Sequence, residues 1–251
     1  MRALRGLLVL ALTCTACAAC GGPTHAHAPP PSGAAELPPE RATPPPSIEW
    51  RDGNFVTTGL PAIARGGEVV VIGYHDADSM RGFPNLRVEV LDRHDQVVWK
   101  VPIMVPTEYE QLAPDGAPSV ELARRIGHAN AELQRLHGVH DLVPMRALGV
   151  LPPGDGVAPH MASGDGIDVD WADDHLHVFR HNSERAVVTR EGTGWLEPDH
   201  KPCAGCDVCH NPAFLDAVFH APEIQAVLVW IGYKGSDTCI EPSARPHVVA
   251  W

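Results

Sequence analysis

The sequence predicts a mainly β protein of α+β character, built as an antiparallel sheet or sandwich with one long and one short helix. Two observations predict this class. Short β-branched runs bounded by turn-forming residues recur through residues 48–251, and one long segment repeats apolar residues at helical spacing. This part of the chain is long enough for one well-cored domain, so we expect a single β-rich globular domain over 48–251.

Four runs predict strands from their β-branched or alternating residues: 69–74, 86–90, 97–105 and 226–233. The second and third runs are separated only by the turn-rich segment 92–96. This short connection predicts that they pair as antiparallel neighbours.

Two helices are predicted from cap signals and periodicity. Pro118–Ser119 supplies a cap for the long helix, and Gly138 is its expected stop. Between them apolar residues recur at spacings of three and four: Leu122, Ile126, Ala129, Leu133 and Leu136. A short helix is predicted from Asn211–Pro212, a cap followed by a first-turn proline, to about His220.

A tight hairpin is predicted around residues 173–174, because only this loop length places the flanking apolar residues on one face. The predicted pairs are Trp171 with Leu176, Val169 with Val178 and Asp170 with His177. The opposite face should then carry a row of acidic and imidazole side chains: Asp168, Asp170, His175 and His177. Such a row can bind a divalent cation or remain a solvated surface, and the sequence leaves both interpretations open.

The net charge and the absence of several catalytic motifs exclude some classes of function. The formal net charge is −12, which argues against DNA or RNA as a partner because phosphate binding depends on Lys and Arg. The motifs GxSxG, GxxxxGK[ST] and HExxH do not occur. The sequence therefore predicts no reaction, and a binding or structural role is favoured over an enzyme.

Residues 1–20 have the layout of an export signal, with two arginines before a short apolar stretch. The small residues before Cys20 resemble the cleavage box of bacterial lipoprotein signals, whose cysteine becomes the lipidated first residue. Cys17 is the alternative acceptor. The leucine usual three positions earlier is replaced by Cys17 or Cys14, which leaves the choice of acceptor open. The resemblance implies acyl chains such as palmitate, and a membrane as the first partner.

Residues 21–47 hold nine prolines and are predicted to form a disordered tether of extended polyproline type. Such a segment holds a domain away from a membrane surface. Together with the signal, it predicts a lipid-anchored protein of the bacterial cell envelope, on the periplasmic or surface side.

The remaining cysteines are Cys203, Cys206, Cys209 and Cys239. Export favours an oxidising compartment and the count is even, so two disulfides with three possible connectivities are the first interpretation. In that case no cofactor is required.

The run Cys206–Cys209 followed by His210 matches CxxCH, which resembles the haem-attachment site of c-type cytochromes. The resemblance implies two thioether bonds to haem, with His210 as the proximal iron ligand. The candidate sixth ligands are Met145, Met161 and His220. On this alternative the protein is a tethered monohaem electron carrier.

A zinc site is the third interpretation. The four cysteines, or His210 in place of one of them, would supply a tetrahedral ligand set for a zinc-stabilised domain. Iron–sulfur binding and CxxC thiol redox chemistry fit less well, because the spacing departs from ferredoxins and no thioredoxin-like order of elements surrounds the motif.

Overall fold

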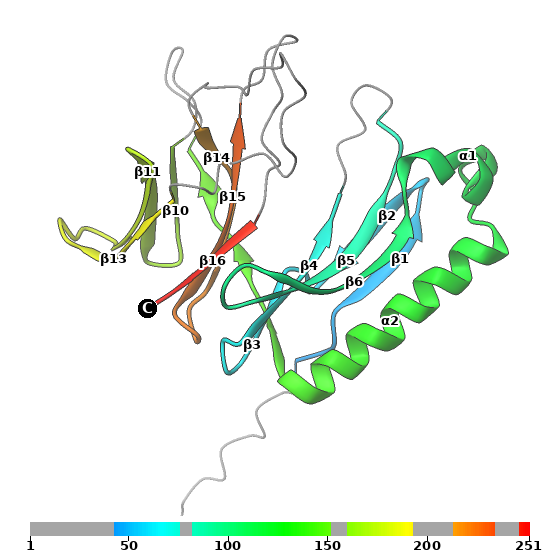
Figure 1. Cartoon of the computed structure of the whole chain (residues 1–251), viewed down its shortest axis with the longest axis horizontal. Coiled ribbons are helices and arrows are strands. Elements are labelled where there is room, and N and C mark those ends of the chain that lie inside the picture. The colour runs from blue at the N-terminus through cyan, green and yellow to red at the C-terminus, as the bar shows by residue number, and fades with distance from the viewer. Residues whose placement is uncertain (1–42, 76–81, 152–159, 193–212, 234–245) are drawn as a thin grey trace, which may run out of the picture. The chain divides into compact units, whose positions relative to one another are not determined.

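The computed structural model describes residues 43–75, 82–151, 160–192, 213–233 and 246–251. Residues 42–251 form one compact unit, and its first strand begins at Ser47. The described elements are antiparallel sheets with one long helix, so the predicted fold class is confirmed (Figure 1). In this part of the chain no helix is long and apolar enough to cross a membrane.

The first half of the unit is a sheet covered by a helix. A hairpin of β1 (Ser47–Arg51) and β2 (Asn54–Thr58) precedes a five-stranded sheet of order β6-β5-β4-β3-β7, here called the helix-side sheet. Its strands are β3 (Ala62–Ala64), β4 (Val69–Tyr74), β5 (Leu86–Asp92), β6 (Val97–Met104) and β7 (Leu142–Pro144). The three strands predicted here are confirmed, as is the antiparallel pairing of β5 with β6.

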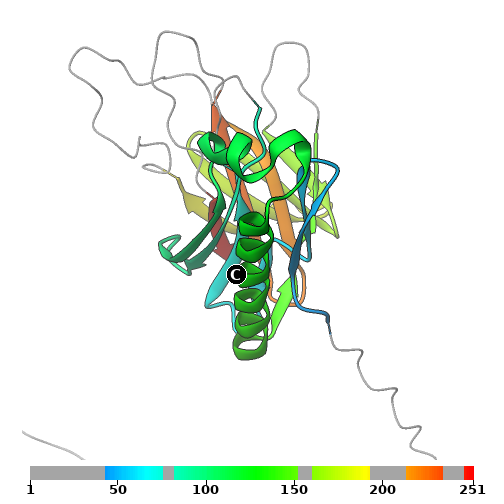
Figure 2. The same cartoon turned by 90° about the vertical axis from the view of Figure 1, so that its right-hand side faces the viewer.

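The helical elements lie between β6 and β7. They are η1 (Pro106–Glu108), α1 (Tyr109–Leu112), η2 (Pro114–Gly116) and α2 (Val120–His140). The predicted long helix is α2, which packs on one face of the helix-side sheet (Figure 2). Ser119 caps it as predicted, since its Oγ accepts a hydrogen bond from the Leu122 amide at 3.1 Å. The predicted stop is wrong: α2 continues through Gly138, and Asp141 in the left-handed conformation (φ 49°) ends it.

The second half consists of two further sheets. The central sheet has the order β16-β15-β14-β8, with β8 (Arg146–Ala147), β14 (Ala213–Ala221), β15 (Ala226–Tyr233) and β16 (Pro246–Ala250). The distal sheet has the order β13-β12-β11-β10-β9, with β9 (Gly149–Val150), β10 (Met161–Gly164), β11 (Ile167–Ala172), β12 (His175–Arg180) and β13 (Ala186–Glu191). The run predicted at 226–233 is β15.

The hairpin of β11 and β12 has the predicted register in every pair. Trp171 opposes Leu176, Val169 opposes Val178 and Asp170 opposes His177. Both turn residues, Asp173 and Asp174, have positive φ, as a two-residue hairpin turn of this twist requires.

The short helix predicted from Asn211–Pro212 to His220 is wrong in position. From Ala213 this segment is strand β14, and the short helix of the described chain is instead η1 with α1, at 106–112. A register shift between Leu215 and Ala217 interrupts the two-residue alternation in β14, which hides its strand character in the sequence.

The central sheet is buried on both faces. Val227, Val229 and Ile231 of β15 pack with the distal sheet, whereas Ala226 and Leu228 pack with the helix-side sheet. Burying a valine, leucine or isoleucine side chain in this way contributes about 1.5–3 kcal/mol. The three sheets therefore share apolar layers through the central one.

Candidate functional site

An open cleft of about 460 Å³ lies between β6 and α2. Its walls are Val101, Pro102, Val105, Glu108, Arg124, Arg125 and His128. The aliphatic side chains come from β6 and the residue that follows it, and the two arginines and the histidine come from the first turns of α2. The cleft thus has one apolar wall and one basic wall.

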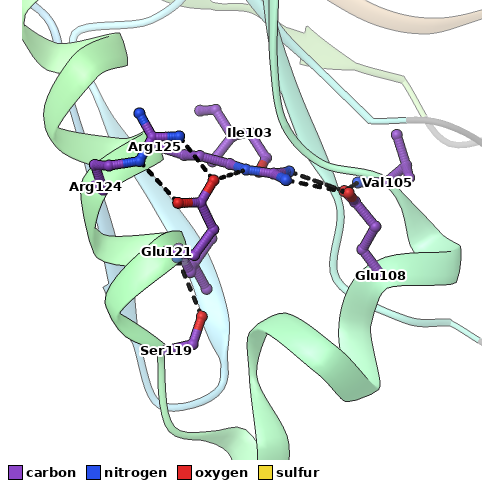
Figure 3. A network of polar contacts seen from close by, with 8 residues as sticks. Ile103, Val105, Glu108, Ser119, Glu121, Arg124 and Arg125 are labelled. Carbon is purple, nitrogen blue, oxygen red and sulfur yellow. Dashed lines mark hydrogen bonds and ion pairs between the residues drawn. The ribbon is translucent and has the colours of Figure 1, made fainter.

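Arg125 is the central residue of the polar network beside this cleft (Figure 3). Its Nε donates to Glu121 at 2.9 Å, its Nη1 donates to Glu108 at 3.0 Å, and Nη1 also donates to the Ile103 carbonyl at 3.2 Å. The guanidinium therefore ties α2 to η1 and to the end of β6. The pKa of Arg125 is raised, chiefly by the hydrogen bonds to Glu108 and Glu121, so this side chain stays charged.

Arg124 and Glu121 form a two-pronged ion pair on the solvent side of the network (Figure 3). Nε and Nη2 of Arg124 each donate to one carboxylate oxygen at 2.7 Å. The pKa of Glu121 is lowered to about 2, mainly by these hydrogen bonds from Arg124 and secondly by the hydrogen bond from Arg125. The side chain of Arg124 remains 67% exposed, so its outer edge faces solvent at the cleft.

Glu108 of η1 is held ionised by its partners in the network. Burial alone would raise its pKa, but hydrogen bonds from Arg125 and from the Val105 amide (3.1 Å) outweigh burial and the pKa lies below its usual value. Both carboxylates here are thus held ionised by their arginine partners. Carboxylates paired in this way are poor general acids or bases near neutral pH.

The sequence shows part of this network. Glu121 and Arg125 are four residues apart, a spacing that places them side by side on a helix. Glu108 lies 17 residues before Arg125, and no local pattern connects the two.

The predicted row of Asp and His side chains lies on one face of the distal sheet. Asp168, His175 and His177 bond to neighbouring protein groups, whereas the buried Oδ1 of Asp170 has no hydrogen-bond partner among the described residues. Asp168 accepts from Ser163 Oγ at 2.6 Å and lies 3.3 Å from His181 Nδ1. His177 Nδ1 lies 3.0 Å from Thr189 Oγ1. In the described ranges no group of three or more His, Cys, Asp or Glu side chains is arranged to hold a metal ion. The cation interpretation of this row therefore gains no support.

The predicted cysteine site and lipid acceptors lie outside the described residues. These are Cys17, Cys20, Cys203, Cys206, Cys209, His210 and Cys239. The strands that flank the two cysteine-bearing segments are described. Ala213 pairs with Tyr233 in the β14–β15 ladder, and Trp230 pairs with Pro246 in the β15–β16 ladder. Both segments are therefore attached at the same end of the central sheet.

Two of the candidate haem ligands lie away from that end. His220 comes seven residues after Ala213, about 23 Å along an extended strand. It is buried, and its ring stacks on Trp251 with centroids 6.0 Å apart. Met145 directly precedes Arg146, the β8 residue that pairs with His220, so it lies at the same far end.

Met161 is placed differently. The Leu148 amide donates to the Val218 carbonyl at 2.8 Å, so the chain after β8 runs along β14 towards Ala213. The Leu151 amide then donates to the Met161 carbonyl at 2.9 Å. Of the three candidates, Met161 is the one on the Ala213 side.

Comparison of the chain with protein-family models, with curated proteins and with solved structures finds no match. Any proposal about function therefore depends on the sequence and on the structure of this chain alone.

Proposed function

We propose that this chain is a lipid-anchored protein of the bacterial cell envelope, whose β domain binds a partner and is braced by disulfides. The observation that carries the binding role is the cleft between β6 and α2. Its basic wall is fixed by ion pairs, its other wall is apolar, and its carboxylates are unsuited to proton transfer.

The anchor rests on the sequence of the N-terminus. The signal in residues 1–20 and the proline-rich segment 21–47 together provide an acceptor, Cys20 or Cys17, and a spacer. At roughly 3.1 Å per residue, an extended spacer of this type would separate the domain from the membrane by several tens of ångströms.

The disulfides are supported by the strand registers. Because Ala213 and Tyr233 are paired, the segments that carry Cys209 and Cys239 join the central sheet at neighbouring strands. A disulfide between Cys209 and Cys239 would close a loop of about 30 residues and add about 3–4 kcal/mol of stability. Cys203 and Cys206 would form the second bridge, or exchange partners with the first pair.

Haem attachment at Cys206, Cys209 and His210 is the second candidate function. The position of Met161, on the Ala213 side of the sheets, favours it over the other candidates as the sixth ligand. The zinc alternative would use Cys203, Cys206, Cys209 and Cys239, or His210 in place of one of them.

Labelling with radioactive palmitate in a bacterial host tests the anchor. We expect incorporation into the unaltered chain and into Cys17→Ser, and loss of incorporation in Cys20→Ser. Loss of incorporation only in Cys17→Ser would identify Cys17 as the acceptor. Incorporation into none of the three proteins would contradict lipid anchoring.

A further inference from the structure

We propose that His220 and Asp165 form a proton-operated latch between the central and distal sheets. In the protonated state the imidazole of His220 binds the Asp165 carboxylate and holds the β10–β11 turn against β14, and in the neutral state it does not. The inference goes beyond the proposed function and depends on neither the cleft nor the lipid anchor. It follows from the burial of His220, its distance to Asp165 and the charges around both.

His220 is buried with one ring nitrogen unused. It lies in β14, pairs with Arg146 of β8, and stacks on Trp251 with the ring planes 11° apart. Its side chain is 4% exposed, and its Nδ1 is buried with no hydrogen-bond partner among the described residues. Buried polar atoms without a partner are rare in folded proteins because they are costly. Nδ1 of His220 therefore has a hydrogen bond to gain.

Asp165 is close enough to supply that bond after a small movement. It belongs to the turn between β10 and β11 and has a φ of 49°. Its Oδ2 lies 3.9 Å from His220 Nδ1, within the range of an ion pair but too far for a hydrogen bond. A movement of about 1 Å would bring the two atoms to the distance of a charge-assisted hydrogen bond. Since the Asp165 side chain is 30% exposed, solvent leaves room for this movement.

The charges around His220 are one positive charge short of neutral. Three charged groups act on the imidazole: Asp165 from the distal sheet, Glu223 from the turn after β14, and Arg146 from β8. Arg146 Nη1 lies 3.8 Å from Asp165 Oδ2, and its Nη2 lies 3.8 Å from Glu223 Oε1, so the guanidinium is hydrogen-bonded to neither. One cation thus faces two anions. A proton on His220 supplies the missing charge.

Protonation changes what Nδ1 can do. A neutral imidazole carries hydrogen on one ring nitrogen only, whereas an imidazolium carries hydrogen on both. In the protonated state Nδ1 is therefore a charged donor, and Asp165 is the carboxylate within 4 Å of it among the described residues. Burial lowers the pKa of His220 below 6.5 and outweighs the opposite effect of the two carboxylates. The latch is therefore open at neutral pH and closes in acidic solution.

NMR of the full chain, labelled with ¹⁵N on histidine and on the backbone, tests the latch from pH 7.5 to pH 4.5. The ring nitrogens of His220 report its protonation, and their signals are identified by their absence in His220→Phe. The Gly166 amide reports the turn, and its shift should follow the same midpoint as His220. Asp165→Asn should weaken proton binding by His220 about ten-fold, the lower end for a hydrogen bond to a charged group.

Glu223→Gln provides the matched control. It removes the same charge from the group around His220, but Glu223 is not within 4 Å of Nδ1. It should weaken proton binding less than Asp165→Asn does, and should leave the Gly166 amide coupled to His220. Asparagine tolerates the positive φ at position 165, and this side chain is partly exposed, so Asp165→Asn should fold even if the buried His220→Phe does not.

Two outcomes would overturn the inference. Equal effects of Asp165→Asn and Glu223→Gln on the protonation of His220 would show that charge acts there without a bond. A Gly166 amide that does not follow the His220 midpoint in the unaltered chain would show that the turn does not respond to the proton. Loss of the Gly166 response in Asp165→Asn, with its retention in Glu223→Gln, is the result that the latch requires.

Discussion

His220 shows how a single buried side chain links folding to pH. Its side chain is 4% exposed, its Nδ1 lies 3.9 Å from Asp165 Oδ2, and within the described residues this nitrogen has no hydrogen-bond partner. Burial lowers its pKa below 6.5, although Asp165 and Glu223 act in the opposite direction and Arg146 reinforces the lowering. The folded state therefore holds this imidazole neutral.

We predict an acid-sensitive contribution to stability from His220. In the unfolded chain the imidazole takes up a proton as the pH falls through about 6.5, while the folded chain resists this, so acid favours unfolding. The free energy of unfolding should therefore decrease from pH 7.5 to pH 5. His220→Phe, which keeps a ring against Trp251, should show a smaller decrease in urea titrations at the two pH values. An identical decrease in both proteins would contradict the assignment.

At the scale of elements, the predictions succeeded where a local pattern decides the structure. The β11–β12 hairpin was predictable because one loop length alone puts Val169 and Trp171 on a common face. The helix α2 was predictable from its cap and its periodicity. Gly138 was misjudged as a stop because a helix tolerates an exposed glycine at a cost of about 1 kcal/mol.

β14 was mispredicted for two physical reasons. Asn211–Pro212 has the chemistry of a helix start, and the register shift between Leu215 and Ala217 breaks the strand alternation. The strand also belongs to the sheet that is buried on both faces, and such strands lack a polar face by which to recognise them. The polar network at the cleft was not predictable from the sequence either, because Glu108 and Arg125 are brought together only by tertiary packing.

Ser119→Ala tests the cap of α2. The Oγ that accepts from the Leu122 amide would be lost, and the free energy of unfolding should fall by about 1 kcal/mol. Ser119→Asp retains an acceptor beside a helix N-terminus and should stay within a few tenths of a kcal/mol of the unaltered protein. Urea unfolding followed by circular dichroism measures both. Equal stability of the alanine variant and the unaltered chain would show that the cap contributes nothing.

At the scale of the whole molecule, one carboxylate joins all three sheets. Asp95, in the turn between β5 and β6, accepts from the Val248 amide of β16 at 2.7 Å and from Arg190 of β13 at 2.8 Å, and lies 3.1 Å from His247 Nδ1. Its side chain is 9% exposed. The layers are therefore fastened by a buried polar contact as well as by apolar packing.

Asp95→Ala should lower the free energy of unfolding by about 3 kcal/mol, because the buried Val248 amide loses its acceptor and Arg190 loses one of its partners. Asp95→Asn keeps an acceptor oxygen and tolerates the positive φ of 63°, so its loss should be smaller. Calorimetric unfolding of both variants provides the measurement. A larger loss in the asparagine variant than in the alanine variant would contradict this role.

The central claim concerns the covalent state of the cysteines, and the intact mass of the exported chain tests it most directly. The chain would be produced in a host with haem-attachment machinery, and denatured without reductant. We predict a chain that begins at Cys20, carries its lipid, and is four hydrogens lighter than the reduced polypeptide, because Cys203, Cys206, Cys209 and Cys239 form two disulfides. A gain equal to one haem would contradict this account and identify an electron carrier, and four intact thiols would direct attention to zinc.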